Sequence, residues 1–433
     1  MSAGHVVAPV TASDGEVSRP AHQGDPVLEI RGLCVDYGWG EEAVHAVVDA
    51  NLTLRRGQVL GLAGESGSGK STLAYAATRL LREPGVITGG EVLFHSHPNA
   101  QSGPDAMAGT ADLLDLDEGD LQRIRWSEIS VVMQSALNAL NPVATIGHQI
   151  EDVLKAHRPD LNRAGRIRRA TELLEMVGIT GDRLGSYPHE LSGGMRQRAM
   201  IAMGLALEPQ VVIMDEPTTA LDVVVQRDIL AQIVELKETL GFSIIFITHD
   251  ISLLLELADR IAVMYAGKLI EVGTAAEMQH EPAHPYTKGL LNSFPSLHGP
   301  RRELAGIPGS PPDLNNPPPG CAFLPRCGYG TEACTRIDMS LAPVSTSADP
   351  SHLTACPFVQ PGTPLPARGR GLGIVGADGA ADPADAVELA GQPPARTAGI
   401  PGDAPLAHAL APDAATALAA ADGTGPGQEE PER

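Results

Sequence analysis

The chain has 433 residues and a formal net charge of −22, which together limit its size and its partners. This length is enough for more than one domain. The acidic balance argues against nucleic acid as a partner, because a nucleic-acid surface needs clustered Lys and Arg. The longest apolar runs, at 211–214 and 243–248, fall far short of the ~20 residues of a membrane span, and no signal peptide opens the chain. We therefore expect a soluble intracellular protein.

Composition divides the chain into four parts. Residues 1–25 are small, polar and aperiodic, so we expect them to be disordered. From 26 to 295, apolar strands alternate with helical segments, which predicts an α/β domain with a largely parallel sheet, interrupted by a loop-like insertion at 96–111. Residues 296–360 are rich in Pro and carry clustered cysteines, and 361–433 form an Ala, Pro and Gly-rich tail expected to be disordered.

The first motif is GESGSGKST, which follows the apolar run QVLGLA and precedes a helical pattern. It fits G-x-x-x-x-G-K-[ST], in which glycines turn backbone N–H groups toward phosphate oxygens. Lys70 would supply a charge to the β- and γ-phosphates, and Ser71 a hydroxyl to Mg²⁺. The alternative is a Gly-rich turn that happens to precede a lysine. The residues predicted to contact ATP here are Gly64, Glu65, Ser66, Gly67, Ser68, Gly69, Lys70, Ser71 and Thr72.

Two carboxylates follow the apolar run VVIM at 211–214. Asp215 at the strand end is placed to join the Mg²⁺ shell, and Glu216 to act as a general base toward an attacking water. The alternative is an acidic strand-to-turn junction. Asp222 is placed to N-cap a helix that Gly241 ends, and this structural role can coexist with a catalytic one.

A third motif, LSGGMRQR, begins another predicted helix at Ser192, Gly193 and Gly194. A helix start of this kind points free N–H groups and the positive dipole end toward an anion. The alternative is an ordinary helix cap.

LSGGMRQR resembles the signature sequence of ATP-binding-cassette (ABC) ATPases, and the order of motifs resembles that family over residues 27–295. The resemblance implies a P-loop NTPase fold with a RecA-like core, an antiparallel β subdomain and a helical subdomain at about 135–205. It also implies that two cassettes enclose two ATP molecules head to tail. Each then contributes Ser192, Gly193, Gly194 and Asp222 in trans to the nucleotide of the other.

The same resemblance gives roles to three further residues. Tyr37 is similar to the aromatic residue that stacks on adenine, Gln134 to the glutamine that touches Mg²⁺, and His249 to the histidine that contacts the γ-phosphate. Their alternatives are a strand-edge aromatic, a polar strand end and a structural histidine. Together with the motifs above, the catalytic set is Glu216, His249, Gln134 and Lys70, and the Mg²⁺ set is Ser71, Gln134 and Asp215.

QSALNALNP, YPHELSGGMRQR, DEPTTALD and HPYTKGLL are similar to the ATP-binding subunits of oligopeptide, dipeptide and nickel importers, as is the C-terminal segment 307–327. One departure is Ser135–Ala136, where that family usually has Asp-Pro. The resemblance implies an ATPase that drives peptide uptake from the cytoplasmic face of the plasma membrane. Its implied partners are two transmembrane permease subunits, a second ATPase subunit and an extracytoplasmic substrate-binding protein. A nickel or small-solute importer, a soluble non-transport ABC ATPase and a regulatory module without turnover are the alternatives.

Four cysteines share the C-terminal region: Cys321, Cys327, Cys334 and Cys356. Four thiolates suit a [4Fe–4S] cluster or a tetrahedral zinc ion, although their spacing fits neither an iron–sulfur run nor a zinc ribbon. The family resemblance implies an iron–sulfur cluster, because some members bind one here. Zinc and unliganded thiols stay open as alternatives.

Overall fold

The computed structural model describes residues 24–40, 43–97, 109–134, 139–219, 221–293, 306–344, 347 and 349–358. Four parts of the sequence predictions lie outside these residues. They are the N-terminal segment up to residue 23, the middle of the 96–111 insertion, Ser135–Ala136 and the tail at 361–433.

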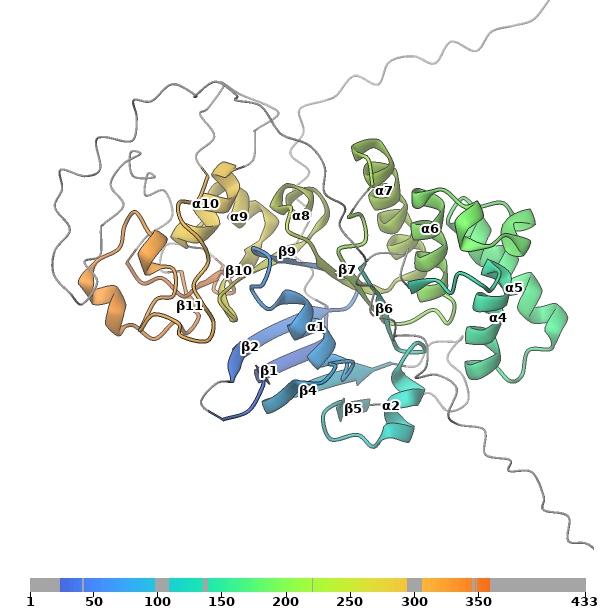
Figure 1. Cartoon of the computed structure of the whole chain (residues 1–433), viewed down its shortest axis with the longest axis horizontal. Helices are drawn as coiled ribbons and strands as arrows, with labels where there is room; N and C mark the ends of the chain where they lie inside the picture. Colours follow the sequence, from blue (N-terminus) through green and yellow to red (C-terminus); the bar gives the residue numbers. More distant parts are fainter. Residues whose placement is uncertain are drawn as a thin grey trace, which may run out of the picture. The chain divides into compact units, whose positions relative to one another are not determined.

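The larger of the two sheets among the described residues has the strand order β11-β12-β10-β9-β3-β8-β7-β6 (Figure 1). Strands β9, β3, β8, β7 and β6 pair in parallel, whereas β10, β12 and β11 extend the sheet antiparallel. The bounds are β3 Val59–Ala63, β6 Ile129–Val132, β7 Val211–Asp215, β8 Ser243–Ile247, β9 Arg260–Tyr265, β10 Lys268–Thr274, β11 Ala342–Pro343 and β12 Leu353–Thr354. The predicted parallel sheet is therefore confirmed.

At the centre of this sheet, β3, β7 and β8 are buried on both faces, which explains why they are continuous apolar runs. On β7, Val212 and Met214 face one core, while Val211 and Ile213 face the other. β3 and β8 divide their side chains between the same two cores. Because every residue of these strands is buried, the phosphate-binding loop and the carboxylates that follow them stand on a rigid base.

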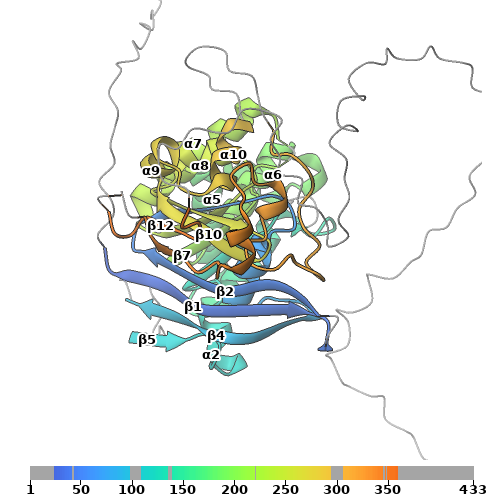
Figure 2. The same cartoon turned by 90° about the vertical axis from the view of Figure 1, so that its left-hand side faces the viewer.

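The second sheet is antiparallel, with the order β2-β1-β4-β5, and Figure 2 shows it as a separate layer below the larger sheet. Its bounds are β1 Pro26–Tyr37, β2 Val44–Arg55, β4 Gly85–Ser96 and β5 Gly109–Asp112. The prediction of a structureless insertion at 96–111 is wrong at both of its ends, since Ser96 of β4 pairs with Gly109 of β5. Pairing at this sheet edge uses backbone groups, so it needs no apolar pattern in the sequence.

The described helices are α1 Lys70–Ala77, α2 Glu118–Ile124, α4 Ile146–His157, α5 Arg163–Met176, α6 Gly193–Gly204, α7 Val223–Leu240, α8 Ile251–Leu257, α9 Ala275–His280 and α10 Pro285–Ser293. α2, α4 and α5 lie along the chain between the 96–111 insertion and the start of α6. Thr145 caps α4 by accepting a hydrogen bond from the His148 N–H. α4, α5 and α6 pack together, on the right of Figure 1.

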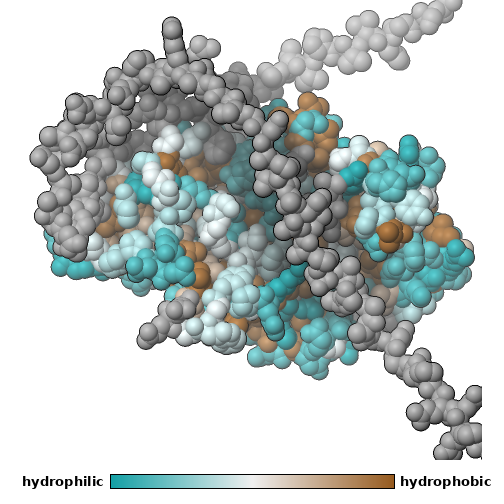
Figure 3. All heavy atoms as spheres, in the orientation of Figure 1, coloured by the Kyte–Doolittle hydropathy of each residue, from teal (hydrophilic) through white to brown (hydrophobic). Residues whose placement is uncertain are grey.

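The surface in Figure 3 is largely hydrophilic, with apolar patches between the polar side chains. Among the described residues, no helix combines the length and the apolar character that crossing a bilayer requires. Val223 and Val224, at the start of α7, are large apolar side chains that face solvent.

Candidate active site

The phosphate loop connects β3 to α1 and has the backbone shape that the motif requires. Gly64 has φ 147° and Gly69 has φ 102°, both in the region that favours glycine. A Cβ on Gly64 would lie 2.3 Å from the Met264 carbonyl oxygen, and one on Gly69 would lie 2.4 Å from that of Ala46. The neighbouring backbone therefore excludes any side chain at these two positions.

Lys70 lies inside this loop. Its Nζ donates hydrogen bonds to the carbonyl oxygens of Gly64 at 2.8 Å and Glu65 at 2.9 Å. Burial lowers the pKa of the Lys70 ammonium, and three nearby carboxylates act in the opposite direction, Glu216, Asp215 and Glu65. The amine is thus desolvated and held by carbonyl groups at the start of α1, where an anion binds.

Asp215 ends β7 and is buried. Its Oδ1 accepts a hydrogen bond from Ser71 Oγ at 3.0 Å, and its Oδ2 accepts one from Tyr75 OH at 2.8 Å. The structure thus brings together two of the three residues predicted for Mg²⁺, whereas the third, Gln134, bonds to Glu216. Sequence reasoning missed Tyr75, although its position four residues after Ser71 on α1 puts both side chains on one helix face. Burial, then the bond to Asp215, raises the pKa of Tyr75, so it remains a donor.

Glu216 contacts two other predicted catalytic residues, Gln134 and His249. Its Oε2 accepts hydrogen bonds from Gln134 Nε2 and from Thr219 Oγ1, each at 2.9 Å, and its Oε1 lies 3.4 Å from His249 Nδ1. Glu216 also has φ 46°, a left-handed conformation that is strained for a residue with a side chain. Thr219 was not predicted. Its spacing of three residues from Glu216, across Pro217, is the only sequence signal for it.

Tyr37 ends β1 beside the phosphate loop. Its hydroxyl lies 3.4 Å from Thr72 Oγ1, in the first turn of α1. This position puts Tyr37 beside the first turn of α1.

The predicted trans-acting residues lie at two adjacent helix starts. Ser192 caps α6, accepting a hydrogen bond from Met195 N–H at 3.2 Å, and Asp222 caps α7, accepting one from Val225 N–H at 3.0 Å. A Cβ on Gly194 would lie 2.7 Å from Val225 Cγ1, so glycine lets the two helix starts touch. The predicted cap at Asp222 and helix end at Gly241 are confirmed.

The metal site predicted in the C-terminal region is not supported. No group of three or more His, Cys, Asp or Glu side chains that could hold a metal ion occurs in the described residues, which include all four cysteines. Burial raises the pKa of the Cys321 thiol to about 11 and that of Cys327 to about 12. The charges of neighbouring C-terminal cysteines, among them Cys334 and Cys356, act in the same direction on both pKa values.

Comparison with known proteins places this geometry in a family. A family model described as ABC transporter matches residues 47–219, which contain the phosphate loop, the α6 start and both strand-end carboxylates. The chain is 41% identical over 342 residues to the oligopeptide transport ATP-binding protein OppD of Bacillus subtilis, covering 78% of this chain and 90% of that protein. The chain belongs to the ABC transporter family. Its ABC-type P-loop ATPase fold is confirmed.

Further comparisons narrow the subfamily of this ABC protein. A second family model, described as the oligopeptide/dipeptide transporter C-terminal region, matches residues 270–334. The dipeptide transport ATP-binding protein DppD of Lactococcus lactis is 39% identical, over 78% of this chain and 93% of its own length. A solved dimeric structure of the ATP-binding cassette MJ0796, in a post-hydrolysis state with ADP and Pi, is 28% identical, covers 57% of this chain and 98% of that chain, and has a TM-score of 0.49.

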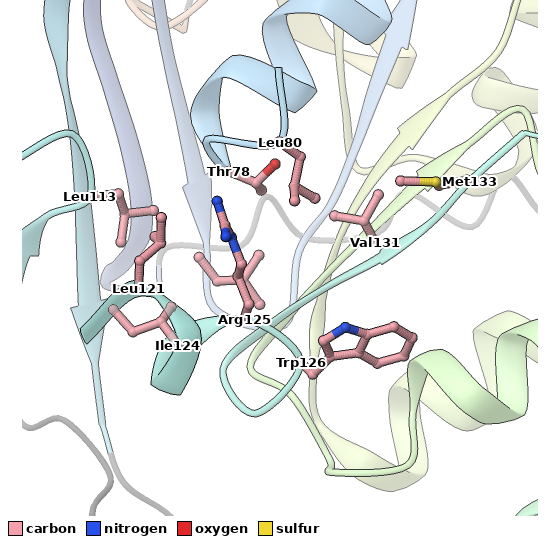
Figure 4. A pocket seen from close by; sticks show the side chains of 10 residues that line it. Thr78, Leu80, Leu113, Leu121, Ile124, Arg125, Trp126, Val131 and Met133 are labelled. Atoms are coloured by element: carbon pink, nitrogen blue, oxygen red, sulfur yellow. The ribbon is translucent and has the colours of Figure 1, made fainter. Parts of the chain in front are cut away.

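This ABC protein also has an apolar pocket of about 140 Å³ outside the nucleotide-binding loop (Figure 4). None of the predicted ATP-contacting residues lines it. Side chains from the end of α1, from α2 and from β6 do, and Figure 4 shows Arg125 and Trp126 among them. We assign it no role in ATP chemistry.

Proposed function

We propose that this chain binds and hydrolyses ATP as the ATPase subunit of an ABC importer for oligopeptides or dipeptides. The relatives named above are oligopeptide and dipeptide transport ATP-binding proteins, and the C-terminal region matches the corresponding transporter model. The chain covers nine-tenths or more of the length of these relatives, so the likeness extends over nearly the whole of each.

The observation that carries the proposal is the convergence at the ends of β3, β6, β7 and β8. Ser71 meets Asp215 at 3.0 Å, and Gln134 and His249 both meet Glu216. Three further motifs that are far apart in sequence, at Gln134, Asp215–Glu216 and His249, thus lie beside the phosphate-binding loop. This arrangement is what phosphoryl transfer needs, because its catalysis is mostly positioning and charge stabilisation.

The residues present fit a Mg²⁺ ion. Ser71 Oγ and the Asp215 carboxylate are hard oxygen donors that already meet, and Gln134 lies at the same strand ends. We assign Mg²⁺ binding to these three residues. A bound Mg²⁺ would supply positive charge that stabilises the phosphate oxygens during phosphoryl transfer.

Each protein group then has a defined task. Lys70 leaves its loop carbonyls to bind phosphate oxygens, and the free N–H groups at the start of α1 bind others. Glu216 accepts the proton of the attacking water, with Thr219 and Gln134 fixing its carboxylate. His249 contacts the γ-phosphate and positions the attacking water relative to it.

The proposed assembly has two transmembrane permease subunits, with two ATPase subunits bound to them at the cytoplasmic face of the membrane. Ser192, Gly193, Gly194 and Asp222 would complete the nucleotide site of a second cassette, which is either a copy or a paralogue. An extracytoplasmic binding protein would deliver the peptide. Nickel or another small solute is the alternative cargo. A soluble non-transport ABC ATPase is disfavoured by the match to the transporter C-terminal region.

The test is ATP hydrolysis and labelled-peptide uptake by the full chain, reconstituted in liposomes with the subunits encoded beside it. We expect Lys70→Ala to lose ATP binding. Glu216→Gln should keep ATP binding and lower hydrolysis at least ~100-fold, as expected for removal of a general base. Glu332→Gln, in an exposed side chain, is the matched control and should behave as wild type. Wild type that binds ATP without turnover would refute the proposal, and hydrolysis coupled only to nickel uptake would favour the alternative cargo.

A further inference from the structure

The C-terminal extension, described over 306–344, 347 and 349–358, contacts the phosphate loop through Arg326. Arg326, at the end of the 3₁₀ turn Leu324–Arg326, donates two hydrogen bonds to the Glu65 carboxylate, from Nη1 at 2.7 Å and from Nη2 at 2.9 Å. Glu65 is the second residue of the phosphate-binding motif. The pair joins positions 261 residues apart in the sequence.

Hydrogen bonds and two aromatic rings hold the guanidinium of Arg326 in place. Its Nε donates to the Pro308 carbonyl oxygen at 2.8 Å, and its Nη1 also lies 3.2 Å from Tyr265 OH. Its Cζ lies 5.8 Å and 5.9 Å from the ring centres of Tyr265 and Phe323. The Arg326 side chain is 6% exposed and that of Glu65 is 26% exposed. A bidentate pair in this setting is preorganised and little screened by solvent.

Glu65 in turn touches the phosphate-binding machinery. Its backbone N–H donates to Tyr286 OH at 2.9 Å, and its carbonyl oxygen accepts a hydrogen bond from Lys70 Nζ. Its carboxylate is among the charges that act on Lys70. Without a partner, this carboxylate would stand as a negative charge beside an incoming triphosphate and would be free to bind Lys70.

We propose that Arg326 is a positioning residue of the nucleotide site. By holding the Glu65 carboxylate, it keeps that charge away from Lys70 and the triphosphate and fixes the start of the phosphate loop. The C-terminal extension is thereby a working part of the ATP site, and not only an addition to the cassette. This inference rests on the proposed ATPase function.

The test compares ATP hydrolysis by full-chain variants in the reconstituted complex. Arg326→Met keeps the packing against Tyr265 and Phe323 and removes the charge, so we expect the KM for ATP to rise at least about tenfold while kcat changes less. Glu65→Gln/Arg326→Met removes the freed carboxylate as well and should recover most of the lost affinity. Arg336→Met is the matched control, because Arg336 is on the same extension, is 76% exposed, and forms its ion pair within the described residues with Glu332.

The double variant distinguishes charge from folding. A merely structural role for Arg326 predicts that the double variant is as impaired as Arg326→Met, and that outcome overturns the inference, as does a wild-type KM in Arg326→Met. If Arg326→Met fails to fold, the double variant is compared with wild type instead, because it buries no unpaired charge. A tenfold higher KM for ATP in the double variant would then also overturn the inference. A wild-type complex that does not hydrolyse ATP would instead refute the proposed function itself.

Discussion

The orientation of the Glu216 carboxylate is set by contacts with a few single side chains. A carboxylate that accepts hydrogen bonds from Gln134 and Thr219 has one orientation, and the third contact, from His249, faces its other oxygen. The left-handed backbone of Glu216 turns the chain directly after β7, so that Asp215 and Glu216 serve different partners although they are adjacent. Strain of this kind persists only where the surrounding structure fixes it.

The buried thiols give a prediction at the same scale. With a pKa of about 11, Cys321 is a thiolate in only about one molecule in a thousand at pH 8. We therefore expect its alkylation by iodoacetamide, followed by mass spectrometry, to be slow and to accelerate about tenfold per pH unit between pH 7 and 9. The urea-unfolded chain is the control, since its thiols have ordinary pKa values and their rate levels off above pH 9. A native rate that levels off below pH 9 would show a stabilised thiolate, as a metal ligand would be.

At the scale of elements, features that depend on neighbouring residues, such as helix ends and buried strands, could be predicted from the sequence. Asp222 and Gly241 bound α7 because capping depends on a few neighbouring residues. The runs at 211–214 and 243–248 form buried strands, because a short apolar run is also a local sequence signal. Contacts between distant segments were not predictable. Nothing near Glu65 indicates Arg326, and nothing near Ser96 indicates its pairing with Gly109, because such contacts depend on the assembled fold.

The α7 cap offers a prediction that separates stability from function. Asp222→Ala removes the acceptor for the Val225 N–H and should lower the free energy of unfolding by ~1 kcal/mol. Asp222→Asn keeps an acceptor oxygen and should stay near wild type in urea denaturation. If Asp222 also acts on the nucleotide of a second cassette, Asp222→Asn lowers hydrolysis without lowering stability. Equal stability of Asp222→Ala and wild type would contradict the cap's contribution.

At the scale of the whole molecule, the extension is anchored to the core by buried polar contacts as well as by apolar packing. Glu271 on β10 is fully buried, and its carboxylate accepts hydrogen bonds from the backbone N–H groups of Ala283 and His284 at 2.7 and 2.8 Å. His352, from the segment leading into β12, lies 3.0 Å from the same carboxylate. One buried charge therefore connects the sheet, the segment before α10 and the extension, and breaking such a set leaves the charge unpaired.

This buried region makes the stability of the fold depend on pH. Burial lowers the pKa of His284 to about 4, against the opposing charge of Glu271, whereas in the unfolded chain the value is near 6.5. Between these values the unfolded chain binds a proton that the folded chain does not. Stability is therefore unaffected by His284 above pH 6.5, falls as the pH drops through the window, and is reduced by about 3 kcal/mol below pH 4.

Replacement of His284 by asparagine tests this linkage. The Asn side-chain oxygen can still accept the hydrogen bond that the Tyr286 N–H gives to His284 Nδ1, and it does not titrate. We expect His284→Asn to be less stable than wild type at pH 8, because it is smaller and leaves space in a buried site. Its Tm should then fall less steeply than that of wild type between pH 6.5 and 4. His148→Asn, at a side chain that is 63% exposed, is the control and should follow the wild-type slope. Parallel slopes for His284→Asn and wild type would mean that His284 takes up its proton equally in the folded and unfolded chain, and that the acid sensitivity of this protein lies in its carboxylates.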